Sequence, residues 1–430
     1  MDFEEALAEI EGRVPTRMVP DLTRISHIAE LLDNPQRAYP TVHVTGTNGK
    51  TTTSRMITAL LEAHGVRAGT YTSPHLQKVT ERIAVRGVPI SEESFADTYT
   101  YLDPFLRLVD SAHSDRVTYF EALTAMAFVR FADELVDAAV FEVGMGGIWD
   151  ATNLVHGEVA VITRVGLDHP ELGSTPLEVA REKAGIIKQG SVVVSEDQAP
   201  EVAALIDDRA GEMEARLLLA GRDLRVADRR IAHGGQMLTL EAAGTYEEVF
   251  LPLHGGHQAR NAALALAAAE AFMGGRALDA ERVRDGFAEV RSPGRIEVAG
   301  HNPLVVLDGA HNPDGARTLA GALREAFIAV REWTVVLACL RDKDIAGILE
   351  ALRPLVSRLI VTRSASPRAA SVERMVSEAR AAGLDAEPCP GIGSALEAAA
   401  SEAGYGAGVV VTGSLYTVGE ARGILIPGRP

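Results

Sequence analysis

The chain has 430 residues, 47% of them hydrophobic, and a formal net charge of −17. Such a length predicts two or three domains, and the acidic balance argues against broad binding to nucleic acids or membrane surfaces. No segment is apolar for long enough to span a bilayer, and the acidic residues 1–5 lack the pattern of a signal peptide. Two cysteines, Cys339 and Cys389, build neither a disulfide framework nor a zinc site by themselves. We therefore expect a cytoplasmic, monomeric protein with no nucleic-acid or membrane partner.

The first strand-like run, residues 41–45, leads into the segment GTNGKT at 46–51, and a helical pattern follows. A strand, a glycine-bearing loop, Lys-Thr and a helix in this order are typical of a nucleotide phosphate loop, whose N–H groups point at phosphate oxygens. Lys50 would neutralise the terminal phosphates, and Thr51 could offer its hydroxyl to a metal ion. The usual pattern has a glycine where this chain has Val44. An ordinary strand-to-helix turn is therefore the alternative.

Short β-rich runs and amphipathic stretches alternate along the first half of the chain. We expect strands at 69–72, 138–143 and 159–163, and helices at 121–131, at 258–272 and from the loop to Gly65. This alternation is typical of a parallel sheet covered by helices. It predicts an α/β fold with a domain similar to P-loop nucleotide hydrolases over residues 1–296.

A boundary is expected near residues 292–295, where Ser, Pro and Gly follow one another. Beyond it the alternation restarts, with expected strands at 304–307, 334–337, 359–362 and 409–412. Residues 297–430 are therefore predicted to form a smaller, Rossmann-like α/β domain, of a normal domain size.

Polar residues stand where neighbouring strands of the first domain are expected to end: Ser73, Glu142 and His169. Ligands of open parallel sheets bind beyond the carboxyl ends of the strands. A hydroxyl, a carboxylate and an imidazole beside a phosphate loop could hold magnesium against a triphosphate, with Glu142 as the natural anchor because magnesium prefers oxygen ligands. A solvated or salt-bridged glutamate and a structural histidine are the alternatives.

The segment 46–51 resembles the phosphate loop of the ATP-dependent amide ligases that include the Mur ligases. Further motifs narrow the resemblance to folylpolyglutamate and dihydrofolate synthases of the bacterial bifunctional type. These motifs are LDNPQ at 32–36, SPHL at 73–76, ERI at 81–83, FE at 120–121, TA at 124–125, EVGMGG at 142–147, DATN at 150–153, EKAGI at 182–186, DGAHNP at 308–313 and GSLYTV at 413–418. The motifs run in order through both predicted domains, which chance does not explain.

The resemblance implies an enzyme that adds L-glutamate to dihydropteroate or to reduced folates, using ATP. It assigns nucleotide binding to Thr47, Asn48, Gly49, Lys50, Thr51, Thr52, Asn261, Arg295, Asp308 and His311. It implies two Mg²⁺ ions bound by Thr51, Ser73, Glu142, His169 and Lys183, and a catalytic group of Lys50, Glu142, His169 and Lys183. The alternatives are a solvated Asn261, a salt-bridged Arg295 and a turn-forming Asp308.

Lys183 is similar to the family lysine that reacts with CO₂ to form a carbamate. This modification turns a cation into an anion that can help to bind magnesium, and a buried lysine loses its proton readily. An ordinary lysine that pairs with Glu182 or with phosphate is the alternative.

The segments 118–121 and 150–153 resemble segments that line a pterin pocket, notably in enzymes that accept dihydropteroate. The residues implied are Thr118, Tyr119, Phe120, Glu121, Asp150, Ala151 and Asn153. The start of a core helix and a plain turn are the alternatives.

The chain also departs from the family pattern. Ile148 stands where a basic residue is frequent, Gly309 replaces a common alanine, and a run of threonines follows Lys50. The segment from His169 to Lys183 is one residue shorter than usual, which puts the local metal geometry in doubt.

Two rival functions remain open at this point. One is a Mur-superfamily ligase that adds amino acids to a nucleotide-linked cell-wall precursor, which the pterin-like segments disfavour. The other is a nucleotide-regulated binding protein without catalysis, against which the presence of Lys50, Glu142, His169 and Lys183 argues.

Overall fold

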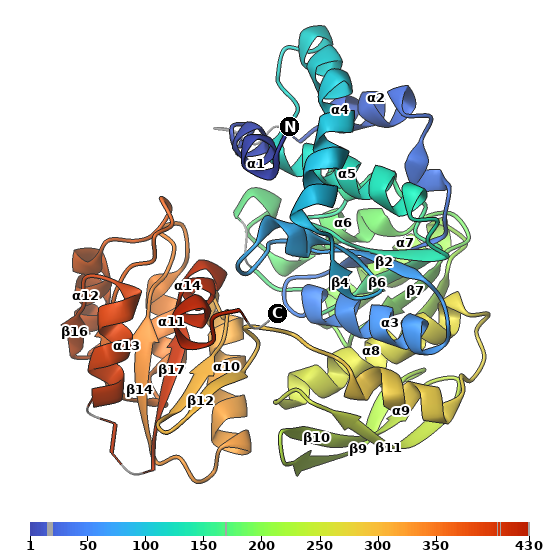
Figure 1. Cartoon of the computed structure of the whole chain (residues 1–430). Helices are drawn as coiled ribbons and strands as arrows, with labels where there is room; N and C mark the ends of the chain where they lie inside the picture. The colour runs from blue at the N-terminus through green and yellow to red at the C-terminus, as the bar shows by residue number, and fades with distance from the viewer. Residues whose placement is uncertain (15–19, 168–169, 402, 405, 429–430) are drawn as a thin grey trace. The chain divides into compact units, whose positions relative to one another are not determined.

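A computed structural model describes residues 1–14, 20–167, 170–401, 403–404 and 406–428 (Figure 1). The chain divides into two compact units. The first comprises Met1–Arg229, Met237–Leu251 and Ala259–Val290, and the second comprises Arg230–Gln236, Pro252–Gln258 and Arg291–Pro430. The predicted α/β class, with a parallel-sheet N-terminal domain and a smaller C-terminal α/β domain, is confirmed. The division that we expect between residues 296 and 297 stays a prediction.

An eight-stranded sheet, in the order β4-β3-β2-β5-β1-β6-β7-β8, forms the centre of the first unit. Its central strand β1 (Thr41–Thr45) pairs in parallel with β5 (Ala138–Glu142) and β6 (Val159–Ile162). The parallel strands continue outward as β2, β7 and β8, whereas β3 runs antiparallel to both β2 and β4. The outer strands are β2 (Ala68–Tyr71), β3 (Ile83–Val85), β4 (Val88–Pro89), β7 (Val192–Ser195) and β8 (Arg216–Leu219).

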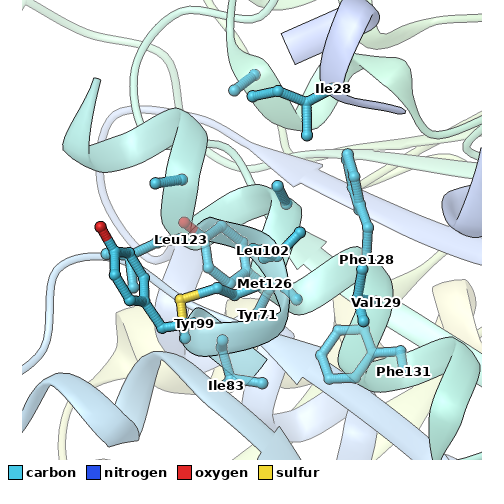
Figure 2. Packing of buried hydrophobic residues seen from close by; sticks show 14 of the residues in the cluster. Ile28, Tyr71, Ile83, Tyr99, Leu102, Leu123, Met126, Phe128, Val129 and Phe131 are labelled. Atoms are coloured by element: carbon cyan, nitrogen blue, oxygen red, sulfur yellow. The ribbon is translucent and has the colours of Figure 1, made fainter. Parts of the chain in front are cut away.

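The helices that pack on this sheet are α3 (Lys50–Ala63), α5 (Tyr119–Asp133), α6 (Pro176–Lys183) and α7 (Pro200–Glu212). Three more helices pack on α5 and on one another: α1 (Phe3–Glu11), α2 (Thr23–Leu31) and α4 (Glu92–Ala112). A hydrophobic core cluster joins α2, α4 and α5 to strands β2, β3 and β5 (Figure 2). Tyr71, Phe128 and Phe131 surround Phe141 at ring-centroid distances of 5.5 to 5.9 Å. This packing anchors α5 on the sheet and thereby places the N-terminus of α5.

Local chemistry fixes where the functional helices begin. Gly49 precedes α3 with a φ of 93°, a conformation that residues with a Cβ rarely adopt. Thr118 and Glu121 form a capping box at the start of α5, and Thr175 with Glu178 does the same for α6. The expected helix end at Gly65 is confirmed, since α3 ends at Ala63 and Gly65 has a φ of 84°.

A second, three-stranded sheet follows in the order β11-β10-β9. It consists of β9 (Arg225–Ala232), β10 (Gly235–Glu241) and β11 (Thr245–Leu251), and two helices follow, α8 (Gly256–Phe272) and α9 (Ala280–Ala288). This small sheet was not predicted from the sequence, because its strands carry many charged residues and most of their positions are exposed or half-buried.

The second unit contains a six-stranded sheet in the order β12-β13-β17-β14-β15-β16. All of its neighbouring strands are parallel except the edge strand β12, which runs antiparallel to β13. The strands are β12 (Glu297–His301), β13 (Leu304–Leu307), β14 (Glu332–Leu337), β15 (Val356–Val361), β16 (Ala386–Pro388) and β17 (Ala407–Thr412). The helices are α10 (Pro313–Ala326), α11 (Ile345–Leu352), α12 (Val372–Ala381), α13 (Ile392–Ser401) and α14 (Leu415–Leu425).

Every strand predicted from the sequence corresponds to an observed strand. The predicted and observed ends differ by at most about two residues, except that β15 begins three residues before its predicted start. Among the described residues, no helix has the length and apolar character that a membrane span requires.

Candidate active site

The loop between β1 and α3 can be built only with glycine at two positions. Gly46 has a φ of 144°, and a Cβ there would lie 1.8 Å from the Oγ1 atom of Thr163. A Cβ on Gly49 would lie 2.8 Å from the Oδ1 atom of Asn261, which is buried on α8. The loop is therefore closely packed between the end of β6 and α8, and Asn261 is not a solvated helix residue.

Hydrogen bonds at Thr47 and Asn48 hold the same loop in place. Thr47 donates a hydrogen bond of 2.8 Å to the carbonyl of Gly166, and Thr163 donates one of 2.8 Å to the carbonyl of Asn48. Thr52 is buried in the first turn of α3. These contacts fix the backbone of the loop, whose N–H groups are the phosphate-binding element expected from the sequence.

Two lysines meet at one carbonyl oxygen. Lys50 Nζ donates to the carbonyl of Gly46 at 3.1 Å and to that of Thr47 at 3.3 Å. Lys183, which is only 4% exposed, donates to the same Gly46 carbonyl at 2.7 Å. The structure thus brings Lys183 from the end of α6 to the phosphate loop, 137 residues away in sequence.

Glu142 joins the loop to the end of the next strand. Its side chain, 1% exposed, accepts a hydrogen bond of 2.8 Å from the Thr51 hydroxyl and one of 3.1 Å from the backbone N–H of Ser73. The alternative of a solvated Glu142 is wrong. We call the residues 46–52 together with Ser73, Glu142 and Lys183 the phosphate-loop cluster.

A pocket opens beside this cluster, with about 270 Å³ of empty space that includes open solvent. Its lining includes Lys50, Lys183 and the loop that follows β5, residues 143–146. His169, predicted as a metal ligand, lies outside the described residues. Among the residues that the structure does describe, no three His, Cys, Asp or Glu side chains gather as a metal site. Three of the predicted metal ligands are brought together, because the Thr51 hydroxyl and the Ser73 backbone N–H both contact the Glu142 carboxylate.

At the start of α5, polar side chains form hydrogen bonds with one another. Glu121 accepts hydrogen bonds from Arg24 Nε at 3.1 Å and from the backbone N–H of Thr118 at 2.7 Å, while Thr118 caps the helix by accepting from Glu121 N–H. Arg24 and Glu121 are both buried. The Glu121 carboxylate therefore fixes the start of α5.

Tyr119 and Phe120, which lie between Thr118 and Glu121, contact neighbouring motifs. The guanidinium of Arg82 lies 5.3 Å from the ring centroid of Tyr119, a distance typical of a cation–π contact. Phe120 packs so closely on the loop after β5 that a Cβ on Gly144 would lie 2.5 Å from its ring. Gly144 is therefore required for this close approach.

The segment after this loop is also tied by internal bonds. Asp150 Oδ2 accepts from Met145 N–H at 2.9 Å, and Oδ1 accepts from Thr152 N–H at 3.0 Å. Ala151 begins η3 (Ala151–Leu154) and is buried. Asn153 Nδ2 donates to the carbonyls of Ile148 at 3.1 Å and of Gly185 at 3.3 Å. We call residues 118–121 and 144–153 the α5–η3 wall.

Two departures from the family pattern have a packing explanation. A Cβ on Gly185 would lie 2.3 Å from the Cγ1 atom of Ile148, so the isoleucine fills the space against the segment that carries Lys183. A Cβ on Gly309 would lie 2.5 Å from the Cδ2 atom of Leu415, which accounts for glycine in place of alanine.

The second unit contains its own predicted residues at the end of β13. Asp308 accepts from Ile296 N–H at 3.0 Å and from Ala310 N–H at 2.9 Å. Burial raises the pKa of Asp308, and the positive charge of Arg295 opposes this rise. His311 Nδ1 lies 2.8 Å from the carbonyl of Gly309, so this nitrogen carries the proton. The second unit thus brings Arg295, Asp308 and His311 together.

Comparison with known families decides the relationship. The Mur ligase middle domain matches residues 44–269, and the Mur ligase glutamate ligase domain matches residues 294–415. The dihydrofolate synthase/folylpolyglutamate synthase of Mycobacterium tuberculosis is 43% identical to this chain, over 95% of this chain and 90% of the relative. The chain belongs to the folylpolyglutamate and dihydrofolate synthase family of Mur ligases. The resemblance predicted from the sequence motifs is confirmed.

Solved structures of this family agree with the fold along the whole chain. Folylpolyglutamate synthase of Mycobacterium tuberculosis in complex with ADP superposes with a TM-score of 0.95 at 42% identity, covering 100% of this chain and 98% of that chain. A folylpolyglutamate synthase in complex with AMPPCP and folate gives a TM-score of 0.88 at 32% identity, covering 99% of this chain and 100% of that chain.

No site role was predicted from the sequence for Arg24, Arg82 or His43, although Arg82 lies in the motif ERI at 81–83. Arg24 and Arg82 contact the α5–η3 wall directly, and His43 reaches it through Thr152 at 2.8 Å. The Thr118–Glu121 capping box, in contrast, has a local sequence signal, because threonine followed three residues later by glutamate is typical of a helix start.

Proposed function

We propose that this chain is an ATP-dependent amide ligase that adds L-glutamate to dihydropteroate and to reduced folates. The observation that carries the proposal is the buried Glu142 carboxylate, which receives the Thr51 hydroxyl from the phosphate loop and Ser73 N–H from the end of β2. Membership of the family narrows the ligase to folate substrates. The neighbouring Lys50 supplies positive charge for ATP phosphates.

The reaction follows from these groups. An oxygen of the substrate carboxylate attacks the γ-phosphorus of ATP, the bond to the β-phosphate oxygen breaks, and ADP leaves an acyl phosphate. The nitrogen of glutamate then attacks the acyl carbon, phosphate departs and the nitrogen loses a proton. Lys50 and the loop N–H groups position the phosphates and stabilise the charge that develops during the first step.

We assign the phosphate-loop cluster and Asn261 to nucleotide binding within an ATP-binding domain of residues 1–296. Arg295, Asp308 and His311 are the nucleotide-contacting residues proposed nearer the C-terminus, and residues 297–430 form the proposed glutamate-ligase domain.

Mg²⁺ is the metal proposed for the phosphate-loop cluster, with two ions as the expected number. Thr51, Ser73 and Glu142 offer the oxygen atoms that Mg²⁺ prefers, and His169 and Lys183 complete the proposed ligand set. Bound Mg²⁺ would neutralise phosphate charge. The fit rests on the convergence of the Thr51 hydroxyl and the Ser73 backbone on one buried carboxylate.

Carbamylation of Lys183 is proposed from its surroundings. Burial disfavours an ammonium ion, and the nearby charge of Lys50 disfavours it further. The neutral amine is the form that reacts with CO₂. Lys183→Ala is expected to lower turnover sharply, whereas the matched variant at the exposed Lys78 retains it. ¹³C NMR in the presence of ¹³C-bicarbonate should reveal a carbamate signal in the wild type that Lys183→Ala lacks; normal turnover of Lys183→Ala would rule out the carbamate role.

The α5–η3 wall is proposed to line the pterin side of the site. The half-buried Thr118, Tyr119 and Phe120 would form its surface and the buried Ala151 would lie behind it. Glu121, Asp150 and Asn153 fix the backbone of the segments that carry them. We further propose that the enzyme is a cytoplasmic monomer whose partners are its small substrates, without nucleic acid or membrane.

The direct test is the release of ADP by the purified chain with ATP, Mg²⁺ and glutamate. Dihydropteroate and tetrahydrofolate are supplied in separate reactions, and mass spectrometry of the products identifies the new amide. We expect a mass increase of one glutamyl residue with each substrate. Absence of turnover with both would refute the proposal, and turnover with a cell-wall precursor would support the rival ligase.

A further inference from the structure

A buried chain of hydrogen bonds connects the central strand to the loop that lines the pocket. His43 of β1 lies with Nε2 2.8 Å from the Oγ1 atom of Thr152. The same Thr152 hydroxyl lies 2.5 Å from Asp150 Oδ1. Asp150 Oδ2 in turn accepts from Met145 N–H. The three side chains of this hydrogen-bond series are buried, those of His43 and Thr152 completely.

The Asp150 carboxylate has its accepting positions filled from within the protein. Its donors are the N–H groups of Met145 and Thr152, the Thr152 hydroxyl, and the backbone N–H of Gly144. A carboxylate has about four lone-pair positions. Asp150 therefore acts on the backbone of Gly144 and Met145, and both of these residues line the pocket.

The surroundings fix the direction of each bond. Since Asp150 accepts several backbone N–H groups, it is the acceptor for the Thr152 hydroxyl, which then must accept from His43. His43 consequently carries its proton on Nε2. Its Nδ1 has no hydrogen-bond partner among the described residues, as expected for an unprotonated nitrogen in the core. Burial lowers the pKa of His43 to about 3, and the charge of Lys188 acts in the same direction.

The same face of β1 holds the loop at a second point. His43 and Thr45 are two residues apart, so they point to the same side of the strand. Thr45 donates a hydrogen bond of 2.9 Å to the carbonyl of Gly146. The loop is thus attached to β1 through His43, Thr152 and Asp150 at its beginning, and through Thr45 at its end.

We propose that His43 and Thr152 are positioning residues, which hold Asp150 against the loop of residues 144–146 and so fix the part of the α5–η3 wall that lines the pocket beside the phosphate-loop cluster. This inference rests on the proposed ligase function only for its kinetic test. A direct contact of Asp150 with substrate is a different role, and the two roles predict different kinetics.

The experiment uses Thr152→Val, His43→Phe and the conservative His43→Gln, whose side-chain N–H can replace that of Nε2. The matched control is Thr58→Val, because Thr58 makes a buried hydroxyl contact of 2.6 Å with Thr70, away from the loop. Thr152→Val is expected to lower kcat by about tenfold, in line with the loss of a hydrogen bond to a charged group. KM for ATP and for the pterin substrate should change by less than about threefold, and His43→Gln should recover most of the loss seen in His43→Phe.

Two readouts do not depend on activity. ¹⁵N NMR of the wild type should show His43 neutral with the proton on Nε2. Amide hydrogen exchange of the peptide spanning residues 143–150 should be faster in Thr152→Val and His43→Phe than in the wild type and Thr58→Val. If His43→Phe does not fold, Thr152→Val and the wild-type NMR spectrum still decide the question.

A proton on Nδ1 of His43, or unchanged exchange and kcat in Thr152→Val, would overturn the proposal. A rise in KM for the pterin substrate alone would also overturn it, in favour of direct contact by Asp150. Absence of turnover by the wild type would count against the proposed function, while the NMR and exchange results would still test the positioning role.

Discussion

The phosphate-loop cluster and the α5–η3 wall use polar residues in different ways. In the phosphate-loop cluster, the Thr51 hydroxyl and the Ser73 backbone converge on Glu142, the carboxylate proposed to hold Mg²⁺, and Lys50 and Lys183 meet at one carbonyl. In the α5–η3 wall, the polar side chains bind their own fold: Glu121 binds Arg24, and Asp150 binds backbone N–H groups. Polar residues within a site motif can therefore either bind a ligand or shape the surface that does.

Loss of charge from the phosphate-loop cluster should have the largest effect. Lys50→Ala is expected to lower kcat by about a thousandfold, because it removes positive charge from the phosphates during transfer. Steady-state ADP release measures this loss, with Lys78→Ala as the control at an exposed ion pair. A loss smaller than about tenfold would mean that the cluster does not stabilise phosphoryl transfer.

Loss of a charge from the α5–η3 wall should instead reduce stability. Glu121→Ala leaves the buried Arg24 without its closest carboxylate partner, and should lower the free energy of unfolding by about 3 kcal/mol. Urea denaturation followed by circular dichroism measures the change. Glu92→Ala, which removes the exposed partner of Lys78, should leave the unfolding curve unchanged. Equal stability of Glu121→Ala and the wild type would show that this ion pair does not hold the wall.

The positioning histidine should make stability depend on pH in a defined direction. In the unfolded chain His43 takes up a proton below its ordinary pKa of 6.5, whereas in the folded protein its pKa is about 3. Between these values the unfolded state binds more protons, so stability falls as the pH is lowered. Relative to His43→Gln, the wild type should lose about 2 kcal/mol between pH 7.5 and pH 5.

Denaturant unfolding of both proteins at several pH values tests this difference. Other titrating groups are common to the two proteins and cancel in the comparison. A difference between wild type and His43→Gln that does not vary with pH would mean that His43 titrates alike in both states.

The smallest effect on stability is expected at Asn153, an uncharged side chain that joins the α5–η3 wall to the segment carrying Lys183. Asn153→Ala removes hydrogen bonds to the carbonyls of Ile148 and Gly185, and should cost about 1 kcal/mol of stability. ATP binding, measured by calorimetry, should be unchanged because the phosphate loop is not contacted. A loss of ATP affinity without a loss of stability would instead place Asn153 with the phosphate-loop cluster.

Prediction from the sequence was most complete for elements whose signals are contiguous. The strand β1, the glycine loop and the start of α3 follow one another, so their order alone predicted a phosphate loop. The three-stranded sheet β9–β11 was not predicted because its strands lack a continuous apolar run. The roles assigned to individual site residues stay predictions.

By itself, the sequence determined the family, the α/β class and the place of the phosphate loop, because each depends on residues that are close together or on motifs in a fixed order. Only the tertiary structure decided what the polar residues of the α5–η3 wall contact. Arg24 and Glu121 are 97 residues apart, and His43 and Thr152 are 109 residues apart. Such pairs form only when the sheet and its helices pack, and no local pattern records which side chains will meet.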